Sequence, residues 1–121
     1  MNGNDIVIVS ATRTAIGKFG GQFATTSAIE LGTTVAKAAI QKANLSPEQI
    51  DTVIFGNVLQ AGLGQNPARQ VGLGAGLSHA STAVTINEVC GSGLKAIISA
   101  AQVLRLGDAK IVLAGGMENM S

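Results

Sequence analysis

The chain is short of charge and of aromatic rings. Of its 121 residues, 12% are charged, 2% are aromatic and 46% are hydrophobic, and neither Trp nor Tyr occurs. A typical globular domain carries roughly 25% charged residues. A net charge of +1 with only 3 Phe excludes the clustered basic face and the stacking platforms of nucleic-acid-binding proteins. Disorder is excluded too, because disordered chains are rich in charge and poor in apolar residues.

Cysteine is almost absent, which excludes an intramolecular disulfide framework and a multi-cysteine zinc site, since Cys90 is the sole example. No membrane span is predicted: the most apolar helix candidate, residues 94–106, includes Lys95 and Arg105 and falls short of roughly 20 apolar residues. The first five residues lack the basic and apolar regions of a secretory signal, so we expect a cytoplasmic protein. A chain this apolar that does not span a membrane must bury part of its apolar surface, either against a partner or inside a larger fold.

What the sequence does contain is an alternation of short β-branched runs and helical patterns. The runs predict four strands, at residues 6–9, 53–55, 83–89 and 111–114. Three helical segments separate them, and a single turn opened by Pro47 precedes the second strand. The order βαβαβαβ predicts an α/β fold with three α-β-α layers, a mostly parallel sheet and helices on both faces.

The helix boundaries are marked by local signals. Ser27 and Glu30 form a capping-box pattern that opens the first helix, and Asn44 is a suitable left-handed residue at its end. Pro67 is predicted to open a short second helix. The third is predicted over residues 91–106 and is closed by Gly107.

Cys90 lies where the third predicted strand turns into the third predicted helix. Helix N-termini present free N–H groups and a partial positive charge, which favour the reactive thiolate. Gly91 and Gly93 keep the turn tight and allow a substrate close to the backbone, and the Cys90 N–H is a candidate donor to an oxyanion. The alternative, a buried cysteine that serves only as a small hydrophobe, stays open on position alone.

Two other hypotheses use the same segment differently. The pattern Gly91-x-Gly93-x-x-Ala96, after a strand and before a helix, also matches a dinucleotide-binding fingerprint, for which Glu118 would be the ribose-binding acid. The chain could also be a non-catalytic assembly module. In that case Cys90 would react slowly with alkylating reagents, as an ordinary structural thiol does.

The remaining polar candidates favour structural roles. His79, the only histidine, is predicted in a surface turn at the far end of the strand from the cysteine. Arg13 and Arg69 could bind an anionic substrate, although lone arginines more often pair with carboxylates or solvent. Asn66 and Gln70 are expected to make loop and cap hydrogen bonds.

The segment around Cys90 resembles a known family. Residues 87–97, Asn-Glu-Val-Cys-Gly-Ser-Gly-Leu-Lys-Ala-Ile, resemble the acyl-cysteine motif of the thiolases. Further matching stretches occur in the family's order at residues 9–17, 20–21, 56–70 and 114–121, with Ala15 where proline is usual. The resemblance covers essentially the whole chain and is strongest to the short-chain members that form acetoacetyl-CoA.

The resemblance implies acyl transfer through a covalent intermediate. The cysteine matching Cys90 attacks an acyl-CoA thioester, and the carbanion of a second acetyl-CoA then attacks the acyl-enzyme. The products are acetoacetyl-CoA and CoA, and the reverse reaction is thiolysis. The resemblance also implies that CoA thioesters are substrates with no separate cofactor and no metal. It further implies a homodimer or homotetramer with residues 83–89 at the interface.

Several family features do not occur in this sequence. There is no second cysteine, no Gly-His-Pro and no Asn-Glu-Ala-Phe. The loop domain that grips CoA and the C-terminal domain are also absent. We therefore expect residues 1–121 to be an incomplete N-terminal thiolase domain, a partial N-terminal half of a thiolase-like fold. These residues alone are expected to be inactive.

Overall fold

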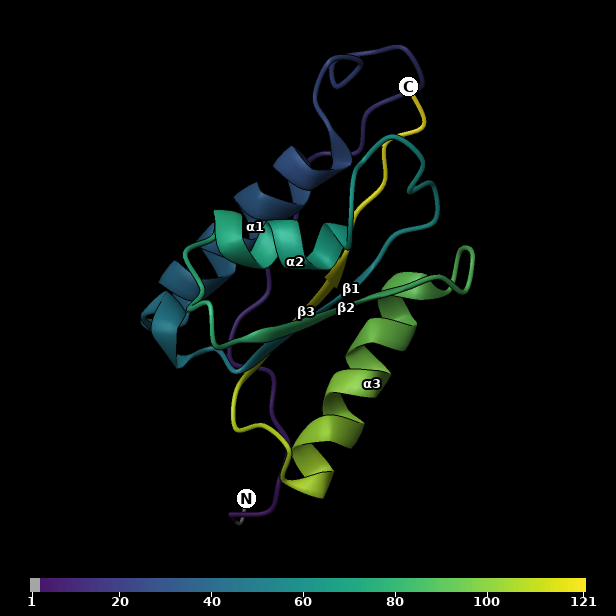
Figure 1. Ribbon diagram of the computed structural model, residues 1–121. Coiled ribbons are helices and arrows are strands. Elements are labelled where there is room, and N and C mark those ends of the chain that lie inside the picture. Colours follow the sequence, from purple (N-terminus) through teal and green to yellow (C-terminus); the bar gives the residue numbers. More distant parts are fainter. Residues whose placement is uncertain (1–2) are drawn as a thin grey trace.

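A computed structural model describes residues 3–121, with a three-stranded parallel sheet between two layers of helices (Figure 1). Residues 1–2 lie outside the described residues. They belong to the N-terminal segment for which the sequence predicts no secretory signal. Across the sheet the strands lie in the order β2-β1-β3. The elements are named next in the order in which they occur along the chain. They are α1 (Ala28–Lys42), the 3₁₀ turn η1 (Pro47–Gln49), β1 (Thr52–Gly56), α2 (Pro67–Gly74), β2 (Thr82–Ile86), α3 (Ser92–Leu106) and β3 (Val112–Gly116).

The central strand β1 divides its side chains between the two faces of the sheet. Val53 and Phe55 point into a cluster with α1 and α2, whereas Ile54 packs against Ala96 and Ala100 of α3. This is the period of two that a strand buried on both faces requires. The steps from β1 to β2 and from β2 to β3 run in opposite directions across the sheet, and α2 and α3 cover opposite faces, so both crossovers have one hand. The predicted α/β class with three layers is confirmed.

The local signals at the helix ends are also confirmed. The Ser27 hydroxyl accepts the Glu30 N–H at 3.1 Å, and the Glu30 carboxylate accepts the Ser27 N–H at 2.7 Å, which completes the capping box of α1. Just past α1, Asn44 adopts a left-handed backbone with φ of 57°, and Gly107 closes α3 with φ of 81°. Such positions favour short polar side chains and glycine.

The predicted first strand, residues 6–9, is wrong. No strand forms there, and the side chains of Val7, Ile8 and Val9 are exposed. A strand needs a hydrogen-bonding neighbour, and residues 6–9 pair with neither of the edge strands β2 and β3. The chain instead follows α1, because the Ser10 and Thr12 hydroxyls donate to backbone carbonyls of that helix.

The predicted third strand is shorter than residues 83–89. Pairing with β1 ends at Ile86, where Gly56 is its partner. Val89 then adopts a positive φ of 53°, which no strand tolerates and which is unusual for a β-branched residue. The last residues of the predicted strand therefore form the turn that leads into α3.

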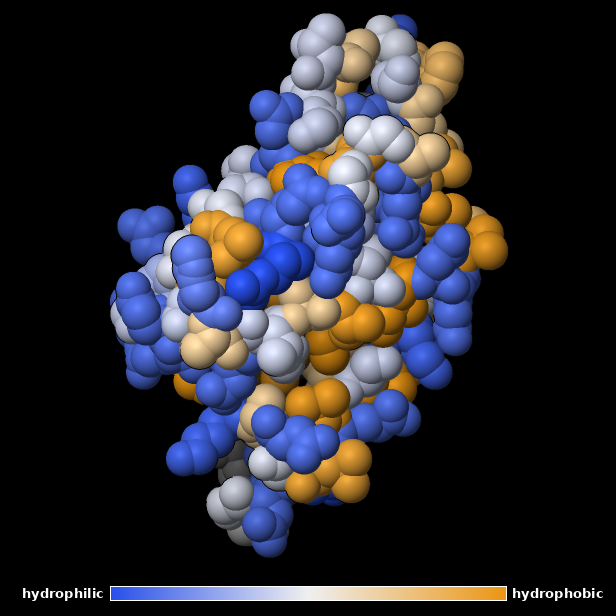
Figure 2. Space-filling view, viewed as in Figure 1, coloured by the Kyte–Doolittle hydropathy of each residue, from blue (hydrophilic) through white to orange (hydrophobic). Residues whose placement is uncertain are grey.

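Helix α3 presents a largely apolar outer face. Hydrophobic residues are visible over this part of the molecule, at the lower right of the view (Figure 2). The sequence predicts that residues 94–106 are too short and too polar to span a membrane. The longer segment of residues 89–106 is, by length and composition alone, just long and apolar enough to do so. A helix with one face on a sheet can be equally long and apolar. The exposed apolar residues of α3 are Leu94, Ile97, Ile98 and Leu106.

Candidate active site at the start of helix α3

Cys90 is exposed and immediately precedes Gly91, the N-cap of α3. Its place beyond the carboxyl end of β2 is where ligands bind in parallel α/β sheets. The preceding residue, Val89, has a left-handed backbone, and such strain costs about 1–3 kcal/mol. The surrounding structure must therefore hold this turn in place.

Ser92 is the side chain that braces the turn. It is buried, its hydroxyl donates to the Val89 carbonyl at 2.6 Å, and the same oxygen accepts the Glu88 N–H at 2.8 Å. The Gly91 N–H donates to the Glu88 carbonyl at 3.1 Å. An exposed ion pair of 3.7 Å between Lys95 and Glu88 adds little, because solvent screens it. The strained backbone is thus closed by hydrogen bonds on both sides of Cys90.

Glycines let the start of α3 rest directly on the sheet. A Cβ on Gly56 would lie 2.5 Å from the Ser92 carbonyl carbon and 2.7 Å from the Gly93 nitrogen. A Cβ on Gly116 would lie 3.2 Å from the Gly93 Cα. The paired residues Gly56 and Gly116 therefore form a floor of bare backbone on which the cysteine-bearing turn is seated.

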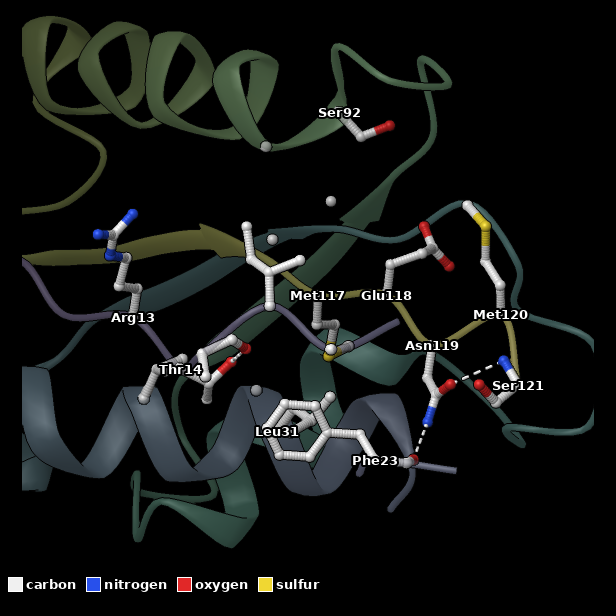
Figure 3. A pocket seen from close by; sticks show the side chains of 18 of the residues that line it. Arg13, Thr14, Phe23, Leu31, Ser92, Met117, Glu118, Asn119, Met120 and Ser121 are labelled. Carbon is white, nitrogen blue, oxygen red and sulfur yellow. Dashed lines mark hydrogen bonds between the residues drawn. The ribbon is translucent and has the colours of Figure 1, made fainter. Parts of the chain in front are cut away.

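Cys90 lines an open cavity of about 660 Å³. Its walls come from the loop of residues 12–19, the start of α3, the side of α1 and the segment that follows β3. Figure 3 shows Ser92 on one wall and Arg13, Met117 and Glu118 below it. The charged side chains that line the cavity are Arg13, Lys18 and Glu118.

The Glu118 carboxylate is already occupied by the protein. One oxygen accepts the Val58 N–H at 2.9 Å, and the other accepts the Leu59 N–H at 3.0 Å and the Asn57 amide at 3.2 Å. A ribose-binding acid needs free acceptor positions, so this arrangement gives the dinucleotide hypothesis no support. Ala96, the last residue of that fingerprint, is fully buried against the sheet. The packing of α3 on the sheet accounts for a small residue at this position without a bound dinucleotide.

The remaining candidates lie elsewhere and hold loops. His79 occupies an exposed turn at the amino end of β2, whereas Cys90 follows the carboxyl end. Arg69 donates to the Ser81 carbonyl at 2.6 Å and to the His79 carbonyl at 3.1 Å. The structure thus brings Arg13 to the Cys90 cavity but leaves Arg69 and His79 outside it.

Asn66 and Gln70 make the predicted loop and cap hydrogen bonds. The Asn66 carbonyl oxygen of the side chain accepts the Arg69 N–H at 3.3 Å and caps α2. The Gln70 amide donates to the Leu63 and Gln65 carbonyls at 2.8 and 2.9 Å. Both residues therefore order the loop before α2.

Two residues shape the site in ways that the sequence did not assign. Ser92 is predicted only as part of a motif, although a serine in the first turn of a helix is a common hydrogen-bonding residue. Asn57 is expected at the carboxyl edge of the sheet together with residues 90–93 and 115–121, and the structure confirms that place: it is fully buried directly after β1, at the same edge as Cys90. Its hydrogen-bond partners are not visible in the sequence pattern.

The fold and this turn define an α/β protein with an exposed cysteine at a strand-to-helix junction. The family model described as "Thiolase, N-terminal domain" matches residues 6–121. The chain therefore belongs to the thiolase family, as the sequence motifs suggested.

Individual relatives agree. The chain is 60% identical over 115 residues to an acetyl-CoA acetyltransferase of Escherichia coli, a match that covers 95% of this chain and 29% of the relative. It is 54% identical over 116 residues to the cytosolic acetyl-CoA acetyltransferase of mouse, covering 96% and 29%. The crystal structure of Acat5 thiolase from Ascaris suum in complex with coenzyme A superposes with a TM-score of 0.89 at 46% identity, covering 90% and 28%. The chain thus spans under a third of the length of these proteins.

Proposed function

We propose that Cys90 is the acyl-accepting nucleophile of an acetyl-CoA acetyltransferase. The observation that carries this proposal is the exposed thiol at a braced, strained turn ahead of α3, inside a cavity lined by the strand ends. Relatives that share this segment are named acetyl-CoA acetyltransferases, and a structural neighbour is a complex with coenzyme A. Acetyl-CoA, acetoacetyl-CoA and CoA are the proposed ligands, with no separate cofactor.

The first half-reaction follows from the local geometry. The Cys90 sulfur attacks the thioester carbon, a new C–S bond forms, and the bond to the CoA sulfur breaks as the tetrahedral intermediate collapses. The CoA leaves as a thiol after it takes up the proton that Cys90 gave up. The Cys90 N–H, directly before the N-cap of α3, is the proposed donor to the developing oxyanion.

The second half-reaction needs groups that move a proton to and from the second acetyl-CoA. His79 lies at the opposite end of β2, and Cys90 itself is acylated at that stage. We therefore assign these 121 residues the acyl-accepting step and propose that they are an incomplete N-terminal thiolase domain. The acid and base of the condensation are proposed to come from other parts of the protein.

The proposal extends to assembly and location. β2 lies at an edge of the sheet, with the side chain of Val84 half exposed, and its free side is the proposed contact of a homodimer or homotetramer. A cytoplasmic location is proposed because the mouse relative is named cytosolic.

The test is acetylation of Cys90. After incubation of the full-length protein with acetyl-CoA, peptide mass spectrometry is expected to find one acetyl group, on Cys90, that is lost on treatment with hydroxylamine as thioesters are. Cys90→Ser is the control and should carry no such label. An acetyl group on another residue would contradict the role of Cys90, and the absence of any acetyl group would leave the assembly-module hypothesis as the better account.

A further inference from the structure

Two carboxylates link the segments that flank β1 and β3 by hydrogen bonds, one at each end of the strand pair. Each such set of hydrogen bonds is called a tie. At the amino end, the Asp51 carboxylate accepts the Lys110 and Ile111 N–H groups at 2.7 and 3.1 Å. At the carboxyl end, Glu118 accepts the N–H groups of Val58 and Leu59. The two ties use the same chemistry on the same strands, but only the second lies beside Cys90.

Asn57 completes the tie at the carboxyl end. Its side chain is fully buried, and its NH₂ group donates to the Met117 carbonyl at 3.0 Å and to the Glu118 carboxylate at 3.2 Å. The other orientation of the amide would place its oxygen against two acceptors, so the hydrogen bonds fix the assignment. The side-chain oxygen has no hydrogen-bond partner although it is buried. The favourable contribution of this amide therefore comes from the donor end that links the two strands.

The tie is connected to the cysteine through backbone contacts. Asn57 follows Gly56 directly, and Glu118 is two residues beyond Gly116, the two glycines of the floor. A Cβ on Gly56 would strike Ser92 and Gly93, so the floor and the start of α3 are in contact without side chains between them. Ser92 in turn holds the Val89 carbonyl. A change in the spacing of the strand ends must therefore shift the turn that carries Cys90.

We propose that Asn57 and Glu118 are positioning residues for Cys90. They hold the carboxyl ends of β1 and β3 at the spacing that seats the start of α3, and so set the place of the thiol and of the Cys90 N–H. This role rests on the proposed function, in which Cys90 accepts the acyl group. Neither residue takes part in bond formation.

The test compares Glu118→Gln with Asp51→Asn, both made in the full-length protein. Each change replaces a carboxylate by an amide at one end of the same strand pair, and only the first is near the cysteine. Asn57→Ala removes the second half of the tie. The readouts are the rate of Cys90 alkylation by iodoacetamide and the rate of Cys90 acetylation by acetyl-CoA. Circular dichroism below the melting temperature confirms that each variant is folded.

Misplacement of a reacting group by about 1 Å can slow a reaction on the order of a hundredfold. We expect Glu118→Gln and Asn57→Ala each to slow acetylation by about tenfold or more, and the double variant to be no slower than the worse single variant. Asp51→Asn should lower the melting temperature but leave both rates at the wild-type value. Equal rates in all three single variants, or equal losses in Glu118→Gln and Asp51→Asn, would overturn the proposal.

A second variant covers the case in which Asn57→Ala does not fold. Asn57→Ser keeps a small donor that cannot reach both acceptors, and it should slow both reactions in the same direction. Failure of the proposed function gives a different pattern, because wild-type Cys90 would then resist acetyl-CoA while iodoacetamide still separated Glu118→Gln from Asp51→Asn.

Discussion

The two faces of the sheet are built differently. Within residues 3–121, the face covered by α1 and α2 buries a cluster of eleven apolar residues, whereas the face covered by α3 buries a cluster of three. On the first face side-chain packing fixes the helices. On the second, Ile54 packs against Ala96 and Ala100, and the start of α3 rests on the backbone at Gly56 and Gly116 and is held by the hydrogen bonds of Ser92. The catalytic candidate thus lies on the face with the smaller buried cluster, next to the close backbone contacts at the start of α3.

The largest expected effect comes from the well-packed face. Phe55 is 1% exposed, and Phe55→Ala should lower the free energy of unfolding by about 3–5 kcal/mol through lost burial and a cavity. Leu94 on α3 is 66% exposed, and Leu94→Ala should stay within about 0.5 kcal/mol. Urea unfolding followed by circular dichroism measures both. Similar losses in the two variants would remove the contrast between the faces.

The next effect probes the backbone contact beneath Cys90. Gly56→Ala places a methyl group against the backbone of Ser92 and Gly93, and overpacking of this kind costs about 1–3 kcal/mol. The alkylation of Cys90 should slow as the turn is displaced. In Gly93→Ala the new Cβ would meet only the Gly116 Cα, at 3.9 Å, so unfolding should be unchanged or slightly less favourable. If Gly93→Ala lowered the free energy of unfolding or the alkylation rate more than Gly56→Ala did, the contact of Gly56 with the start of α3 would not be the critical one.

A smaller effect concerns the outer surface of α3. Leu94, Ile97 and Ile98 are exposed, and such an apolar face promotes association of copies of the chain. Light scattering of the purified chain should detect oligomers or aggregates. Ile97→Lys should shift the distribution toward smaller species without a change in melting temperature, whereas Lys37→Ala on α1 should not. A monodisperse monomer at the highest soluble concentration would contradict this prediction.

The smallest effect is a dependence of stability on pH. The pKa of Asp51 lies below its ordinary value of 3.8, chiefly because the Lys110 and Ile111 N–H groups donate to the carboxylate, with the Lys110 charge adding to this. A lowered pKa in the folded state means that the carboxylate stabilises the fold above pH 3.8 and that this contribution is lost as the pH falls through the folded-state pKa. The melting temperatures of wild type and Asp51→Asn should therefore differ at neutral pH and converge in acid. A gap that widened in acid would contradict the assignment.

The sequence predicted those parts of the fold that local signals determine. The capping box of Ser27 and Glu30 and the glycine that closes α3 depend on neighbours within a few residues, and both are confirmed. Residues 6–9 have the composition of a strand but no strand beside them, and pairing is not visible in composition. The same holds for Val89, whose β-branched side chain favours a strand although the turn imposes a positive φ.

The candidate site was predictable to the extent that it follows the strand-to-helix turn. Cys90, Gly91 and Gly93 are adjacent in sequence, so their grouping could be inferred directly. The role of Glu118 could not, because its partners Val58 and Leu59 lie about sixty residues earlier in the chain and meet it only when β1 pairs with β3. Contacts between strand ends need the sheet order, which the sequence pattern left open.

The most direct test of the central claim is exchange of CoA. If Cys90 accepts the acetyl group reversibly, isotopically labelled CoA should enter acetyl-CoA in the presence of the full-length protein and without a second acyl acceptor, because the acyl-enzyme returns its acetyl group to free CoA. The account predicts exchange with the wild-type protein and none with Cys90→Ser. Exchange that persisted in Cys90→Ser, or the absence of both exchange and acetyl-Cys90 in the wild-type protein, would contradict it.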